Sequence, residues 1–310
     1  CMKAYERLLN YAVVYTTSDE ESTTVPTSAR QFDLANLLVE ELKAMGVSDA
    51  AVDELCYVYA TLPATAGFEN ATKLGFIAHM DTAPDFCGEH VKPRIIEHYD
   101  GKDVALGTSG RSLTSAQFPH LKSLKGRTLI VTDGTTLLGA DDKAGIAEIM
   151  TMLEWLITEK VPHGKISVCF TPDEEVGSGA DHFDVARYGA DFAYTCDGGA
   201  EGELEYENFN AAGAEFLIRG FNVHPGEAKD KMINALSVAC EINAMLPKGQ
   251  TPRDTSGYEG FWHLTKLDGT TEAAKLAYII RDHDWQIFQS RKATLERIAE
   301  ALNEKYGDGT

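Results

Sequence analysis

The chain has 310 residues, of which 44% are hydrophobic and 25% are charged, a composition that predicts a large buried core in one large domain or two ordinary ones. Its formal net charge is −20, and such a surface repels phosphate backbones, so we expect no nucleic-acid partner. No apolar run approaches the ~20 residues of a membrane-spanning helix, and no signal peptide opens the chain, so we expect no membrane association.

Helices and strands alternate over the first two thirds of the chain. Apolar residues at helical spacing predict helices over 3–16, 28–46 and 143–159. Apolar runs predict strands over 51–60, 73–78, 128–132, 165–171 and 190–195. A polar stretch from 85 to 127 predicts loops and short strands. This alternation predicts an α/β fold whose mainly parallel sheet, flanked by helices, carries a site at one edge.

The pattern changes near residue 208, which we predict to be a domain boundary between 1–208 and 209–310. From just before this boundary onward, strands are predicted over 203–206, 214–218, 257–267 and 275–281, and helices over 231–245 and 285–305. Two strand–helix units of this kind predict a small antiparallel α+β domain that is inserted in, or appended to, the first one.

His79 and Asp81 directly follow the predicted strand 73–78. Side chains two residues apart share one face of a strand, so these two can point the same way. Asp81 can then accept the imidazole N–H and leave the other ring nitrogen free to bind a metal. A single His-x-Asp pair is more often an ordinary surface pair, so this pattern needs support from the rest of the chain.

Asp141 follows an apolar approach that includes Gly139, a residue that lets the backbone come close. The carboxylate of Asp141 could bridge two cations. The alternative is that Asp141 or Asp142 caps the helix that begins near Lys143, where the helix dipole favours negative charge. The two roles are compatible if each aspartate takes one of them.

Glu174 and Glu175 follow the predicted strand 165–171 through a Thr-Pro turn. Adjacent side chains leave the chain in different directions, so one can bind a metal while the other carries protons between an attacking water and a leaving amine. A nearby cation and partial burial shift a carboxylate pKa in opposite senses and can tune it toward neutrality. The alternative is a solvated acidic turn.

Asp197 follows the predicted strand 190–195 and precedes two glycines. Carboxyl ends of parallel strands meet at one edge of a sheet, so we expect His79, Asp141, Asp197 and the pair Glu174 and Glu175 to converge there. One imidazole and several carboxylates suit a divalent metal such as zinc, with an adjacent acid free for proton transfer.

Six cysteines are scattered along the chain without a Cys-x-x-Cys pair. Two of them, Cys169 and Cys196, lie in apolar strand-like runs, where reduced cysteine behaves as a small hydrophobic residue. This usage predicts a reducing, cytoplasmic location.

Five segments carry a family resemblance: 78–86, 133–145, 170–177, 222–226 and 281–284. They resemble the M20 family of dinuclear zinc exopeptidases, and the Thr-x-Pro-Asp-Phe sequence after Asp81 is similar to its peptidase T group of tripeptide aminopeptidases. The resemblance covers essentially the whole chain. It implies a zinc-binding catalytic domain with an inserted α+β lid domain, two zinc ions per subunit, a small peptide substrate and a homodimer. The implied reaction is the release of the N-terminal residue from tripeptides.

Carried over position by position, the resemblance also implies a metal-ligand set. His79 and Asp197 would hold one zinc, and Asp141 would bridge it to the second. Glu175 would bind the second zinc.

The remaining site residues are implied in the same way. Glu174 would be the general base and acid, and Asp81 would orient the metal-binding histidine. His224 would help to stabilise the oxyanion, and Arg281, with Asn234 as a further candidate, would contact the substrate's C-terminal carboxylate.

Members of the peptidase T group continue well past position 310, and the histidine ligand of the second zinc lies in that further part. We therefore expect both predicted domains to be incomplete here, and a polypeptide that ends at Thr310 to lose most of its activity. One alternative function is that of another M20 amidohydrolase, namely a dipeptidase, carboxypeptidase or deacylase. A non-catalytic metal-binding relative is a second alternative, and the presence of Glu174 argues against it.

Overall fold

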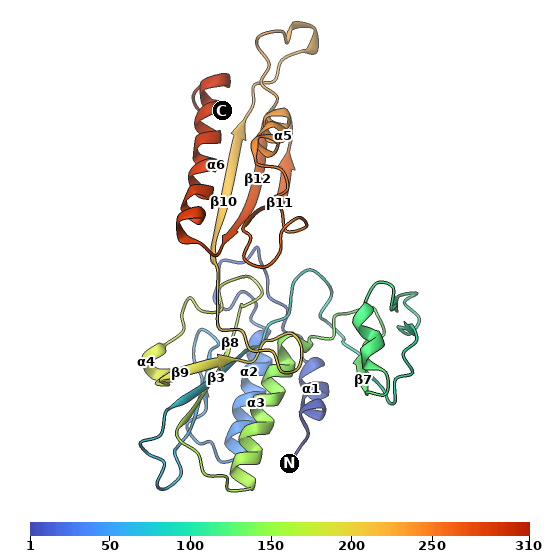
Figure 1. The fold of residues 1–310 in the computed structure, drawn as a ribbon, viewed down its shortest axis with the longest axis vertical. Helices are drawn as coiled ribbons and strands as arrows, with labels where there is room; N and C mark the ends of the chain where they lie inside the picture. The colour runs from blue at the N-terminus through green and yellow to red at the C-terminus, as the bar shows by residue number, and fades with distance from the viewer. The chain divides into compact units, whose positions relative to one another are not determined.

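The computed structural model describes residues 1–310 and divides into two compact units, Cys1–Glu203 and Leu204–Thr310 (Figure 1). Each unit has a hydrophobic core of its own. No helix combines the length and the apolarity that crossing a lipid bilayer requires.

The first unit is built on a five-stranded sheet in the order β1-β2-β8-β3-β9. Its strands are β1 (Ala51–Val52), β2 (Val58–Leu62), β3 (Leu74–His79), β8 (Ile166–Thr171) and β9 (Phe192–Thr195). β3 runs parallel to both β8 and β9, whereas β2 and β1 are antiparallel to their neighbours. The predicted α/β class is confirmed, and the parallel part of this mixed sheet is the part whose strand ends carry candidate site residues.

Three helices pack against one face of this sheet: α1 (Ala4–Ala12), α2 (Gln31–Ala44) and α3 (Ala140–Thr158). Leu34, Leu38 and Leu42 recur every four residues along α2, and each is 0% exposed. Burying a leucine side chain contributes roughly 1.5–3 kcal/mol, so this stripe fixes which face of α2 meets the sheet. The opposite face is covered by an aromatic cluster around Tyr57 and Tyr188, the latter from the short helix α4 (Val185–Tyr188).

Short elements occupy the stretch in which we predicted loops and short strands. β4 (Arg94–Ile96) pairs with β7 (Leu129–Val131), and β5 (Val104–Ala105) pairs with β6 (Ser112–Leu113). A 3-10 helix, η1 (Pro119–Leu124), lies between them in sequence. A small core that includes Tyr99 holds these pieces together.

The second unit is a three-stranded antiparallel sheet in the order β10-β12-β11. Its elements are β10 (Asn210–Arg219), η2 (Pro225–Glu227), α5 (Ala235–Met245), β11 (Phe261–Gly269), β12 (Ala273–Asp282) and α6 (Trp285–Tyr306). Leu276, Tyr278 and Ile280 alternate along β12 and are buried in a core that α5 and α6 share. This is the small α+β arrangement predicted for this region.

Several predicted elements differ from the structure; the first helix ends at Ala12 rather than at residue 16, and β11 begins at Phe261 rather than at residue 257. The strand predicted over 51–60 is two strands, β1 and β2, because the chain turns between them: Asp53 Oδ1 accepts the N–H groups of Leu55 and Tyr57. The segment 203–206 forms no strand. The helix predicted over 231–245 begins only at Ala235, because Asn234 caps it.

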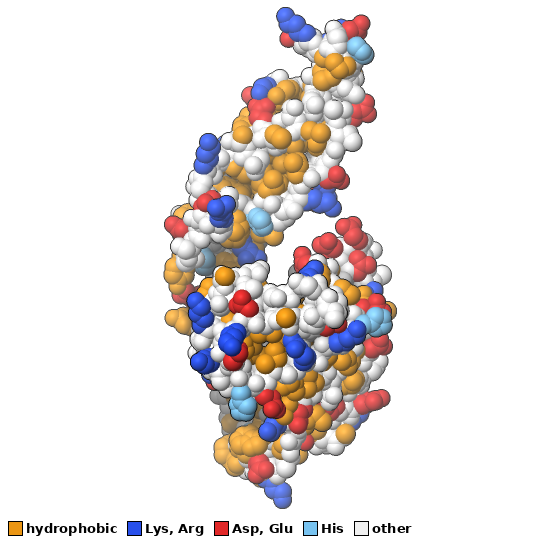
Figure 2. Space-filling model, turned by 90° about the vertical axis from the view of Figure 1, so that its right-hand side faces the viewer, with side chains coloured by type: hydrophobic (Ala, Val, Ile, Leu, Met, Phe, Trp, Pro, Cys, Tyr) orange, Lys and Arg blue, Asp and Glu red, His pale blue; other side chains and the backbone are white.

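Acidic and basic side chains are interspersed over each unit on the face shown in Figure 2. The net charge of −20 is therefore not gathered in a single region of that face.

A buried arginine joins α1, α2 and α3 in the first unit. Arg7 is 2% exposed, and its Nε lies 2.7 Å from Glu41 Oε1 on α2. Its Nη2 lies 2.8 Å from Glu154 Oε2 on α3, and its Nη1 donates to Thr151 on the same helix. One guanidinium therefore ties α1 to both of the other helices.

Replacing Arg7 with alanine should lower the free energy of unfolding of the first unit by about 3 kcal/mol, because two partly buried carboxylates lose their cation. Urea denaturation followed by far-UV circular dichroism measures the change. The matched control is Arg127→Ala, which breaks an ion pair whose partners are 64% and 83% exposed and should have little effect. Equal effects of the two substitutions would contradict this interpretation of Arg7.

Candidate metal site

The candidate site is centred on the imidazole of His79, the last residue of β3. The side chain is 2% exposed, and its Nδ1 lies 3.0 Å from the carbonyl oxygen of Asp81 and 3.3 Å from Asp81 Oδ1. These acceptors hold a proton on Nδ1, so Nε2 is the ring nitrogen that can give up its own proton and bind a metal. Asp81 can therefore accept the Nδ1 proton through its carbonyl oxygen or through its carboxylate.

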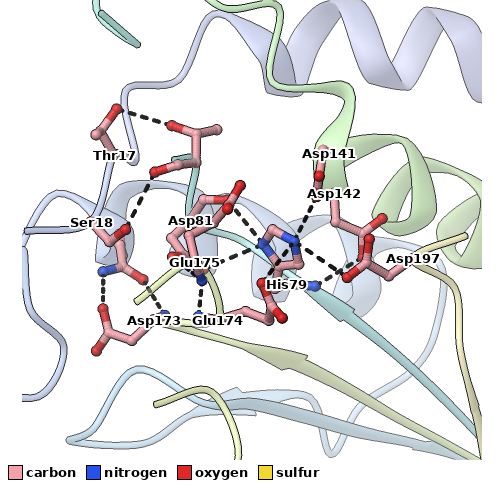
Figure 3. A network of polar contacts seen from close by, with 12 residues as sticks. Thr17, Ser18, His79, Asp81, Asp141, Asp142, Asp173, Glu174, Glu175 and Asp197 are labelled. Atoms are coloured by element: carbon pink, nitrogen blue, oxygen red, sulfur yellow. Dashed lines mark hydrogen bonds and ion pairs between the residues drawn. The ribbon is translucent and has the colours of Figure 1, made fainter. Parts of the chain in front are cut away.

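Three acids from different parts of the chain face His79 Nε2 (Figure 3). Asp141 Oδ1 lies 2.8 Å from this nitrogen, Asp197 Oδ2 3.6 Å and Glu174 Oε2 3.7 Å. One ligand atom each from His79, Asp141 and Asp197 lies within 4.8 Å of the other two. One imidazole nitrogen and two carboxylate oxygens at this spacing fit a divalent cation such as zinc.

The sheet explains how residues so far apart in sequence meet. β3 and β9 run parallel and deliver His79 and Asp197 at the same edge. β8, on the other side of β3 and also parallel to it, ends just before the turn that carries Glu174. Asp141 arrives at the start of α3. The structure thus brings together four of the residues singled out in the sequence.

Several acidic side chains lie at this edge of the sheet, and burial and mutual repulsion shift their pKa values in the metal-free protein. Burial, followed by repulsion from Asp197, raises the pKa of Asp142 to about 8, and burial raises the pKa of Glu175 to about 7. Burial by itself lowers the pKa of His79, but the contact with Asp81 and the other acids outweighs this and raises it to about 10. A bound divalent cation would favour the ionised carboxylates, so the site is electrostatically suited to one.

Asp81 has a second role that the sequence did not indicate. It is 0% exposed, and its two carboxylate oxygens accept the backbone N–H groups of Glu174 (3.0 Å) and Glu175 (3.1 Å). The same carboxylate therefore positions both the histidine and the glutamate turn. Glu175 lies outside the group of three possible ligands formed by His79, Asp141 and Asp197.

The predicted helix-capping role for Asp141 or Asp142 is wrong. α3 has Gly139 at its N-cap and no side-chain cap, and both aspartates have non-helical backbone angles. Their carboxylates face the site instead: Asp142 Oδ2 accepts the backbone N–H of His79 at 3.1 Å. Asp142 therefore holds the backbone of His79 in place.

Lys143 is a buried residue that the sequence did not single out as functional. It is 1% exposed, and its Nζ donates to the carbonyl oxygen of Val14 at 2.7 Å. Burial lowers its pKa to about 8. The contact ties the start of α3 to the segment after α1.

A cavity of about 540 Å³ adjoins the site, with His79, Glu174 and Asp197 among its lining residues. Apolar side chains, including Ile77 and Phe183, line other parts of it. The cavity therefore leaves room for a small organic molecule beside the group of possible metal ligands and beside Glu174.

The three remaining predicted site residues lie in the second unit. His224 is exposed, and its Nδ1 accepts the N–H of Gly226 at 3.1 Å. Asn234 Oδ1 caps α5, a structural role that accounts for this residue by itself. The Arg281 guanidinium carbon lies 4.5 Å from the centre of the Phe209 ring. Their substrate and oxyanion roles stay predictions.

Similar sequences were found over nearly the whole chain. It is 54% identical over 308 residues to a peptidase T of Alkaliphilus oremlandii, covering 98% of this chain and 75% of that protein. It is 55% identical over 305 residues to a peptidase T of Geobacillus thermodenitrificans, covering 98% of this chain and 74% of that one. A family model described as a peptidase dimerisation domain matches residues 206–310.

Solved structures with the same fold include two bacterial peptidases. A tripeptidase from Staphylococcus aureus superposes with a TM-score of 0.68 at 21% identity, covering 98% of this chain and 72% of that one. The aminopeptidase PepT from Bacillus cereus gives a TM-score of 0.63 at 23% identity, covering 94% and 70% of the two chains.

The raised pKa of Asp142 predicts how the stability of the metal-free protein depends on pH. Unfolded Asp142 loses its proton near the ordinary value of 3.8, whereas the folded residue holds it up to about 8. Between these values the unfolded state binds fewer protons, so stability falls as pH rises, by up to about 1.4 kcal/mol per pH unit. The raised pKa of His79 adds a loss of the same sign above its unfolded value of about 6.5.

Replacing Asp142 with asparagine should reduce the pH dependence between pH 5 and pH 6.5, where Asp142 is already ionised in the unfolded state but still protonated in the folded one. The raised pKa of Glu175 leaves a smaller slope of the same sign. Thermal unfolding in the presence of a chelator at several pH values measures the slope. Asp100→Asn, which alters an exposed aspartate, is the matched control. An unchanged slope in Asp142→Asn would show that this carboxyl group is not the source.

Proposed function

The chain belongs to the peptidase T family, and from this premise we propose that it releases the N-terminal residue from tripeptides by metal-dependent hydrolysis. The observation that carries the proposal is the arrangement around one nitrogen. His79 Nε2 faces the carboxylates of Asp141 and Asp197, and Glu174 lies 3.7 Å away beside a cavity. A set of possible metal ligands, a carboxylate that can carry a proton and a cavity for a substrate are thus adjacent.

Two zinc ions are the cofactors we propose. His79 and Asp197 would hold one ion, Asp141 would bridge, and Glu175 would bind the second. Bound zinc lowers the pKa of a coordinated water and polarises a carbonyl group. The chemistry of the donor set supports the first position directly, since three ligand atoms already lie within 4.8 Å of one another.

Glu174 is the proposed general base and acid. Its side chain is 52% exposed, so a substrate and a water can reach it from the cavity. Burial on its other side raises its pKa, which brings a carboxylate closer to the neutral range in which proton transfer in both directions is efficient. It would take a proton from the attacking water and return it to the leaving amine nitrogen.

Asp81 acts in this proposal as a positioning residue. Its contacts with the His79 ring and with the Glu174 N–H keep the metal-binding nitrogen and the proton carrier at a fixed separation. Oxyanion stabilisation by His224, and carboxylate recognition by Arg281 and Asn234, are the further roles we propose for the second unit.

We also propose a homodimer and a cytoplasmic location. The match of residues 206–310 to a peptidase dimerisation domain supports the first. Six free cysteines, of which Cys56 and Cys169 are buried, support the second, because reduced thiols persist in a reducing compartment.

A substrate screen tests the proposed reaction. Tripeptides with a free amino terminus should be hydrolysed to a free amino acid and a dipeptide, while N-acylated tripeptides and N-acyl amino acids should not. Amino-acid release followed by mass spectrometry measures both. Preferential hydrolysis of N-acyl amino acids or of dipeptides would instead favour the alternative of another amidohydrolase of the same larger family.

Replacing Glu174 with glutamine should lower kcat for tripeptides by roughly 10²- to 10⁴-fold, the range associated with loss of a general acid–base group. Metal content by atomic spectroscopy should stay near that of the wild type, since Glu174 is not among the proposed ligands. Glu54→Gln, at an exposed position of the same unit, should leave both unchanged. Retained turnover in Glu174→Gln would exclude this residue as the proton carrier.

A further inference from the structure

We infer that Asp173, Gln31 and Thr27 form a clasp that positions Glu174 for proton transfer. The three residues are called the Asp173 clasp below. Asp173 directly precedes Glu174 in the chain, and its partners come from the start of α2 and the segment before it. The inference rests on the proposed role of Glu174, and it adds a set of positioning residues to it.

The clasp is a closed set of hydrogen bonds. Asp173 is 1% exposed and Gln31 is 0% exposed. Gln31 Nε2 donates to Asp173 Oδ1 at 2.7 Å, and Gln31 Oε1 accepts the backbone N–H of Asp173 at 3.2 Å. Thr27 donates to the same carboxylate through its backbone N–H, at 2.9 and 3.0 Å, and through its hydroxyl at 2.6 Å.

The backbone at this point depends on such support. Asp173 has a φ of +56°, in the left-handed region that residues other than glycine rarely adopt. This angle sets the direction in which the chain leaves β8, and so where Glu174 begins. The amide of Gln31 bonds to both the N–H and the carboxylate of Asp173. Both bonds can form together only in one orientation of the peptide group of Asp173.

Two buried carboxylates therefore hold the glutamate turn from different sides. Asp81 accepts the N–H groups of Glu174 and Glu175, while the clasp fixes the residue before them. The Asp173 carboxylate is turned away from His79 in Figure 3, and it accepts a hydrogen bond from Gln31 at the start of α2. Its hydrogen bonds go to Thr27 and Gln31 rather than to the proposed metal ligands, so its effect on the reaction would pass through the placement of Glu174.

The main test compares kcat and KM in substitutions that separate the clasp from the backbone angle. Gln31→Met keeps a similar volume without the amide, and Asp173→Gly permits a positive φ without the carboxylate. Both should lower kcat for tripeptides roughly 10- to 100-fold, the scale of a misplacement of about 1 Å, with KM nearly unchanged. Asp173→Asn keeps one acceptor oxygen and tolerates the left-handed region, so it should restore most of kcat.

A control and a second variant keep the test informative. Gln117→Met, at an exposed position of the same unit, should behave as the wild type. Should a Gln31→Met protein fail to fold, Gln31→Asn retains the amide but withdraws it by one methylene and should give the same loss of kcat. Wild-type kcat in the Gln31 variants, or full activity in Asp173→Gly, would overturn the clasp.

Hydrogen exchange in the metal-free protein gives a readout that does not depend on activity. The amides of residues 173–178 should exchange faster in Gln31→Met than in the wild type or in Gln117→Met, while those of β3 should not change. Unchanged exchange in 173–178 would overturn the inference. Absence of tripeptide hydrolysis by the wild type would defeat the proposed function instead, and the exchange result would still decide whether the clasp holds this turn.

Discussion

A buried carboxylate with three partners, Asp81, is the constraint on which the candidate site depends. It is 0% exposed, and a charge taken out of water in this way is tolerated only where several donors replace the lost hydration. Its donors are the ring of His79 and the N–H groups of Glu174 and Glu175. These hydrogen bonds to Asp81 hold the imidazole and the glutamate turn in one arrangement.

Much of this arrangement follows from short-range rules. Alternation along a strand puts Ile77 and His79 on one face of β3, where both line the same cavity. Parallel pairing of β3 with β8 and β9 brings the residues after those strands to one edge. The sequence therefore sufficed to predict the α/β class, the helices α1 to α3, and a convergence of His79 with Asp141 and Asp197.

The rest depended on contacts that no local pattern encodes. Gln31 and Asp173 are 142 positions apart, and a glutamine at the start of an amphipathic helix is typical of solvent exposure. The role of Asp142 was not predicted because acids before a helix usually cap it. Here the chain adopts non-helical angles, and the carboxylate accepts the N–H of His79. The role of Lys143 was not predicted because its partner, Val14, is 129 positions away. The turn between β1 and β2 was missed because a side chain, that of Asp53, makes it.

The two separate hydrophobic cores have an evolutionary consequence. Each unit buries its own apolar side chains, and a domain that closes its own core accommodates internal changes without repacking its neighbour. Mutations that reshape β10, β11 or β12 can therefore accumulate while the geometry around His79 is preserved. Such modularity lets selection diversify one part of a molecule while the inherited chemistry of the other stays intact.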